Sequence, residues 1–120
     1  MRILVADDDR IVSHLISSLL RDRGHDVLQA FDAMQAVMFS SRAPIPDALV
    51  LDINMPGGTG LDVLRRIKAS AKTAHVRVVV LSATLDPKME EQVKQLGAGA
   101  FLKKPVDPGA LCEALGIPVL

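Results

Sequence analysis

The sequence contains no tryptophan and no tyrosine, and it has only one cysteine and three phenylalanines among its 120 residues. The single cysteine, Cys112, excludes a disulfide within the chain and is typical of proteins from a reducing compartment. Acidic and basic residues balance at fourteen each, so the chain lacks the net positive charge that favours nucleic acid or an anionic membrane surface. It also lacks the long apolar core of a signal peptide and any apolar run that could span a bilayer. We therefore expect a cytoplasmic protein that binds neither nucleic acid nor membranes directly.

Hydrophobic residues make up 49% of the chain, which is enough to build one core. Short runs of valine, isoleucine and leucine alternate with segments whose apolar residues recur at helical spacing. The strands are expected at 2–6, 26–30, 48–53, 76–83 and 100–102. Strict alternation of five strands with five helices predicts an α/β fold with a parallel, doubly wound sheet. Because the sequence has no linker or internal repeat, we expect one domain over residues 1–120.

The starts of several helices can be read from single residues. Asp9 is expected only to cap the first helix, and Asp32 is expected to cap the second with Gln35 reaching back. Thr59 leads the third helix, where Asp62 can complete a capping box. The apolar residues of the first helix are expected on one face: Ile11, Val12, Leu15, Ile16, Leu19 and Leu20.

Polar residues stand at the carboxyl ends of four predicted strands, where doubly wound sheets bind their ligands. Asp7 and Asp8 follow the first strand, Asp52 and Ser82 end the third and fourth, and Lys104 follows the fifth. Three carboxylates so close would repel one another unless a cation relieved the repulsion, and oxygen ligands alone suit Mg²⁺. The lysine and the serine fit phosphoryl oxygens, with Asp52 as the attacking carboxylate. This set of residues favours metal-assisted phosphoryl transfer.

With these residues in place, the sequence resembles the receiver domain of bacterial response regulators, the phosphoacceptor half of two-component signalling. The resemblance covers nearly the whole chain and rests on four motifs: "ILVADDD", "LVLDINMPGGTGLDVLRRI", "VVVLSAT" and "GAGAFLKKP". It implies a flavodoxin-like sheet with the strand order 2-1-3-4-5. The chain departs from the family motif at Thr59, where an aspartate is usual.

The resemblance also implies a metal site for Mg²⁺ or Mn²⁺. Asp7 and Asp8 match the acidic pair of this site, and Asp52 matches the phosphorylated aspartate, which is also a metal ligand. Asn54 matches the residue whose backbone carbonyl completes the protein ligands.

The remaining matched residues concern the phosphoryl group and the response to it. Ser82 matches the hydroxyl residue that meets the phosphoryl group, Ala83 the residue that offers a backbone N–H, and Lys104 the lysine that pairs with a phosphoryl oxygen. Phe101 occupies the aromatic switch position and is expected to start from a more exposed rotamer. Pro105 matches the proline that follows a cis peptide bond.

The function implied is Mg²⁺-dependent transfer of a phosphoryl group to Asp52 from the phosphohistidine of a histidine kinase or a histidine phosphotransfer protein. A conformational change would then alter binding to a downstream protein that the sequence does not identify. Such a protein catalyses only its own phosphorylation and dephosphorylation. The kinase is expected to contact the exposed side of the first helix, through Arg10, Ser13, His14 and Ser17.

Two other functions are compatible with the residues. The chain could be a binding module that keeps the fold and is never phosphorylated. It could also be a small hydrolase with an aspartyl nucleophile, although such enzymes generally have a second acid where this chain has Asn54.

Overall fold

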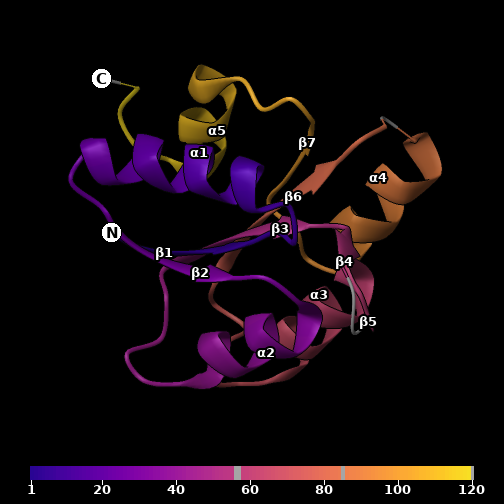
Figure 1. Cartoon of the computed structure of the whole chain (residues 1–120). Helices are drawn as coiled ribbons and strands as arrows, with labels where there is room; N and C mark the ends of the chain where they lie inside the picture. Colours follow the sequence, from indigo (N-terminus) through magenta and orange to yellow (C-terminus); the bar gives the residue numbers. More distant parts are fainter. Residues whose placement is uncertain (56–57, 85, 120) are drawn as a thin grey trace.

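The computed structural model describes residues 1–55, 58–84 and 86–119 and contains a five-stranded parallel sheet (Figure 1). Its strands are, in spatial order, β2 (Asp26–Ala30), β1 (Arg2–Ala6), β3 (Ala48–Asp52), β6 (Arg77–Ser82) and β7 (Ala100–Lys103). When these five strands are numbered by themselves along the chain, the order is 2-1-3-4-5, which confirms the predicted fold. A short antiparallel pair, β4 (Asn54–Met55) and β5 (Gly58–Thr59), lies outside this sheet and was not predicted.

Helices cover both faces of the sheet, and each face has its own hydrophobic core. Helices α1 (Arg10–Asp22) and α5 (Pro108–Leu115) pack on one face. Helices α2 (Ala33–Ser41), α3 (Gly60–Ala69) and α4 (Pro87–Gln95) pack on the other. The central strand β3 is buried along its whole length, because both of its faces are covered. Among the described residues, none of the helices combines the length and the apolar content that crossing a membrane requires.

The predicted helix starts are confirmed by hydrogen bonds. Asp9 Oδ1 accepts from the backbone N of Ile11 and of Val12, at 3.0 and 3.2 Å. At α2, Asp32 Oδ1 accepts from Gln35 N at 2.7 Å, while Gln35 Oε1 accepts from the backbone N of the residue before the cap.

At α3, the expected capping box is complete. Thr59 Oγ1 accepts from Asp62 N at 3.2 Å, and Asp62 Oδ2 accepts from Thr59 N at 3.3 Å. Thr59 is therefore the N-cap of α3 at the position where the family motif has aspartate, and the helix begins at the next residue.

Two of the apolar residues that were expected on one face of α1 do not lie in the core. Ile11 and Leu15 are 74% and 62% exposed, whereas Ser13 and Ser17 are buried. The apolar residues of this helix extend over a wider surface than the sheet covers, so Ile16 and Leu20 are buried while Ile11 and Leu15 remain exposed. The two serines complete the buried face, and Ser17 Oγ accepts a hydrogen bond from Gln29 Nε2 on β2 at 2.9 Å.

Candidate functional site

The carboxyl edge of the sheet brings together the three acidic residues that the sequence singled out. Ala6 pairs with Leu51 across β1 and β3, so the next residue on each strand, Asp7 and Asp52, lies at the same level. One carboxylate oxygen from each of Asp7, Asp8 and Asp52 lies within 4.8 Å of the other two. Asp7 and Asp52 are buried and Asp8 is exposed, so the acidic cluster opens to solvent on one side.

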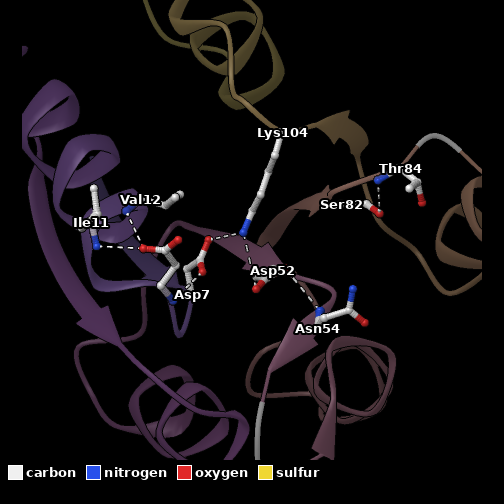
Figure 2. Close-up of polar contacts among 9 residues, drawn as sticks. Asp7, Ile11, Val12, Asp52, Asn54, Ser82, Thr84 and Lys104 are labelled. Carbon is white, nitrogen blue, oxygen red and sulfur yellow. Dashed lines mark hydrogen bonds and ion pairs between the residues drawn. The ribbon is translucent and has the colours of Figure 1, made fainter.

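The Lys104 ammonium lies against two of these carboxylates. Its Nζ is 2.7 Å from Asp7 Oδ2 and 3.5 Å from Asp52 Oδ2 (Figure 2). The backbone of Lys104 is fixed beside β6, because Lys104 N donates to Ser82 O at 2.8 Å. The following peptide bond, to Pro105, is cis, as the resemblance implied. Its neighbour Lys103 ends β7 and is exposed.

The charge of the lysine does not balance the cluster. Burial alone would lower the pKa of Lys104, but its contacts with Asp7 and Asp52 outweigh that effect and raise the pKa above 10.5. The pKa of Asp52 is raised from 3.8 to about 6, first by burial and then by the charge of Asp7, with a smaller contribution from Asp8. A hydrogen bond from Asn54 N to Asp52 Oδ1, at 3.2 Å, and the charge of Lys104 oppose this rise only in part.

The cluster has the donor set that a hard divalent cation requires. The ligand atoms are carboxylate oxygens only, and they hold an excess of negative charge in a largely buried position. Asp7 and Asp52 are both buried, and among the described residues the Lys104 ammonium is the one cation that contacts them. Three carboxylates beside one ammonium leave an excess of negative charge in this site, which is costly without a further cation, so these residues fit Mg²⁺ or Mn²⁺.

Ser82 lies on the same rim, at the end of β6. It is buried, and the residue before it, Leu81, pairs with Asp52 across β3 and β6. Its Oγ accepts a hydrogen bond from Thr84 N at 3.3 Å (Figure 2). Ala83 follows in an exposed bend, so its backbone belongs to the solvent-facing side of the rim.

The comparison with protein families agrees with this arrangement. The model of the response regulator receiver domain matches residues 3–116. The chain belongs to this family. The resemblance drawn from the four sequence motifs is therefore confirmed.

The alignments with individual relatives cover nearly all of this chain but very different shares of the relatives' own lengths. The sensory/regulatory protein RpfC of Xanthomonas campestris pv. campestris is 38% identical over 117 residues, which are 96% of this chain but only 16% of that protein. The chemotaxis protein CheY-3 of Vibrio cholerae is 30% identical over 116 residues, 96% of this chain and 88% of that protein. Among solved structures, the chemotaxis response regulator CheY4 of Vibrio cholerae superimposes with a TM-score of 0.88 at 27% identity, covering 99% of this chain and 98% of that one.

One residue of this receiver domain is placed differently from the expectation. Phe101 was expected to start from a more exposed rotamer, but it is buried in the core on the α2, α3 and α4 side of the sheet. It pairs with Val80 across β6 and β7, and both side chains belong to that core.

The sequence reasoning missed Gly60, which packs against the backbone of the acidic cluster. A Cβ at this position would lie 2.6 Å from both Asp52 O and Ile53 Cα, closer than real contacts allow. Gly60 N also donates to Ile53 O at 2.8 Å. The receiver domain therefore needs glycine here to bring the start of α3 against the end of β3, and the stretch "GGTG" was the available signal.

Proposed function

We propose that the chain forms one receiver domain over residues 1–120 and acts as a phosphoacceptor switch, with Asp52 as the residue that takes the phosphoryl group. The donor is the phosphohistidine of a histidine kinase or of a histidine phosphotransfer protein. The observation that carries the proposal is the cluster of Asp7, Asp8 and Asp52 oxygens within 4.8 Å, with Lys104 Nζ 3.5 Å from Asp52 Oδ2. A cap or a surface ion pair has no need for that much buried charge.

Asp7, Asp8 and Asp52, with the backbone carbonyl of Asn54, would hold Mg²⁺ or Mn²⁺. The bound ion would supply positive charge to the transferring phosphoryl oxygens and relieve the repulsion among the carboxylates. The raised pKa of Asp52 is consistent with its proposed role as the nucleophile. At about 6 it leaves the carboxylate mostly ionised at pH 7, and therefore nucleophilic.

In the transfer step, a carboxylate oxygen of Asp52 attacks phosphorus. A P–O bond forms as the P–N bond of the phosphohistidine breaks, and the electron pair of that bond returns to the imidazole nitrogen. Lys104 places its ammonium beside the attacking carboxylate, where charge on the equatorial oxygens develops. The Ser82 hydroxyl and the Ala83 backbone N–H are the donors for the other phosphoryl oxygens.

The conformational change that follows phosphorylation begins at Ser82. To reach the phosphoryl group, its hydroxyl must give up the hydrogen bond from Thr84 N at 3.3 Å, which alters the loop between β6 and α4. Phe101, on the adjacent strand, responds through the packing below that loop, and the surface of α4, β7 and α5 changes with it. Phosphorylation shifts this equilibrium only by its different free energy in the two states. The affinity for a downstream protein changes as this conformational equilibrium shifts.

The proposed contact with the phosphodonor is on α1, beside exposed Asp8, but it differs from the expected one. Ser13 and Ser17 are buried and cannot take part. The exposed residues there are Arg10, Ile11, His14 and Leu15, a mixed apolar and basic surface. Exposed aliphatic side chains at this position are best explained by a partner that covers them during transfer.

The test is the intact mass of the protein after incubation with acetyl phosphate, with and without Mg²⁺. One added phosphoryl group that disappears in Asp52→Asn and in the presence of a chelator is the expected result. Asp9→Asn is the matched control, because Asn also caps helices and Asp9 is outside the acidic cluster. It should keep the adduct.

Two outcomes contradict the proposal. A folded protein that forms no adduct and releases no inorganic phosphate would be a binding module. Rapid, repeated release of phosphate from added substrates would instead indicate the aspartyl hydrolase.

A further inference from the structure

Helix α2 has an unusual composition for a helix at the surface. None of its residues from Ala33 to Ser41 is charged. Ala33 and Ala36 face the core, yet Met34 and Met38, four residues apart on one outer face, are 74% and 45% exposed. A helix that is apolar on both sides is normally covered on both sides.

The outer face of α2 forms one wall of a groove, and α3 forms the other; the two helices lie side by side (Figure 1). Met34, Val37, Met38 and Val63 give the groove an apolar lining. Its charged residues are Arg42, Arg65, Arg66 and Asp62, so cations outnumber acids three to one. The groove is separate from the acidic cluster and from the exposed surface of α1.

We propose that the α2–α3 groove binds an acidic amphipathic helix of a partner protein. A groove with an apolar lining between two helices can accommodate the apolar face of a third, and methionine side chains adapt to the shape of what they contact. The arginines would pair with acids that flank the apolar face of the bound helix, since their planar guanidinium groups suit carboxylates.

The ion pair that Arg65 already makes does not compete with this binding. Arg65 Nη1 is 3.3 Å from Asp62 Oδ1, with both side chains at least half exposed, and such surface pairs contribute little to stability. Arg65 can therefore exchange this partner for an acid on the incoming helix. This inference concerns the unphosphorylated protein and does not depend on the proposed phosphoryl transfer.

Two other occupants suit the groove less well. A second copy of this chain, bound symmetrically, would bring this arginine-rich surface against an identical one, so that like charges approach each other. An anionic bilayer presents a flat surface, which does not fit a groove between two helices. The charge and the concave shape together favour the acidic helix.

The experiment is a titration of the ¹⁵N-labelled full chain, followed by backbone amide chemical shifts. The probe is a synthetic helical peptide of about five turns, with leucines on one face and glutamates on both flanks. One comparison peptide replaces the glutamates by lysines, and another distributes the same leucines around the helix. We expect saturable shifts in α2 and α3 with the first peptide only, weakened by added salt.

Three variants locate the binding. Met38→Glu and Arg66→Glu should each weaken it by about tenfold or more, because both changes put negative charge where glutamates must lie. Val119→Glu is the matched control, since Val119 is 49% exposed, close to the 45% of Met38, but follows α5, which packs on the other face of the sheet. It should bind like the wild type, and each variant's amide spectrum reports whether it is folded.

The proposal is overturned by any of five results. The acidic peptide could produce no saturable shifts, or shifts on α1 instead of α2 and α3. The lysine peptide could bind as tightly as the acidic one. Sedimentation could reveal a dimer of the chain that Met38→Glu dissociates. Finally, vesicles of phosphatidylglycerol and phosphatidylcholine could sediment the protein through Met38 while the peptides fail to bind.

Discussion

Replacing Asp52 by asparagine should stabilise the metal-free protein at neutral pH, although it removes the residue that we propose accepts the phosphoryl group. Asp52 is only 5% exposed and shares its surroundings with Asp7. Burial and this neighbour together raise its pKa from 3.8 to about 6. Asparagine keeps the shape of the side chain without the charge, and Lys104 still has Asp7 at 2.7 Å.

The sign and size of the effect follow from the proton linkage. Between 3.8 and about 6, the folded state holds the Asp52 proton more tightly than the unfolded state does, so folding becomes less favourable as the pH rises. The stability that the protonated Asp52 side chain contributes is fully present below pH 3.8 and is lost as the pH rises through its folded-state pKa of about 6. Each pKa unit corresponds to about 1.4 kcal/mol, so the buried charge costs at most about 3 kcal/mol at pH 7.

The measurement is urea unfolding at pH 4 and at pH 7, followed by far-ultraviolet circular dichroism, because the chain has no tryptophan for fluorescence. The free energy of unfolding of Asp52→Asn minus that of the wild type should increase by about 2.4 kcal/mol between the two pH values, because a small part of the effect is already present at pH 4. Asp22→Asn, at an exposed site on α1, is the control for losing one negative charge.

Mg²⁺ gives a second check on the same residue. At pH 7 the ion should stabilise the wild type, by about 2.7 kcal/mol at a concentration one hundred times its dissociation constant. Asp52→Asn should gain less, because an amide is a weaker ligand than a carboxylate. The reasoning is refuted if the stability difference between variant and wild type does not change with pH, or if Asp52→Asn is the less stable protein at pH 7.

Three further predictions concern the surroundings of the cluster. Gly60→Ala should lower the free energy of unfolding by about 1–3 kcal/mol in urea titrations, because its Cβ would lie 2.6 Å from Asp52 O, and wild-type stability would contradict that contact. Lys104→Gln should lower the free energy of unfolding at pH 7 by about 1–3 kcal/mol in urea titrations, because two carboxylates lose their counter-charge. Mg²⁺ should restore the lost stability, and a variant that Mg²⁺ does not stabilise would argue against a cation in the cluster. Thr59→Ala should lower the thermal unfolding midpoint through a loss of about 1 kcal/mol, while Thr59→Asp, which can still cap α3, should not.

Much of the candidate site could be predicted because it depends on the ends of strands. Asp7, Asp52 and Ser82 each follow a run of apolar residues, and parallel strands bring their carboxyl ends to one edge of the sheet. The capping residues Asp9 and Thr59 were likewise predictable, since their hydrogen bonds are made within a few residues of sequence.

Other features could not be predicted, because they depend on which surfaces meet. Leu15 is apolar and yet exposed, while Ser13 is polar and yet buried, since the position of the sheet decides which side of α1 it covers. Phe101 is buried because its side of β7 faces the core that α2, α3 and α4 cover.

The sequence by itself determined the alternation of strands and helices, the helix starts and the identity of the charged residues at the strand ends, because local periodicity and local hydrogen bonds specify them. Only the tertiary structure decided that the residue at position 60 must be small, that the pKa of Asp52 is raised to about 6, and that Met34 lines a groove with Arg66. Each of these properties depends on which groups the fold brings together and on how far it buries them, and local sequence does not specify either.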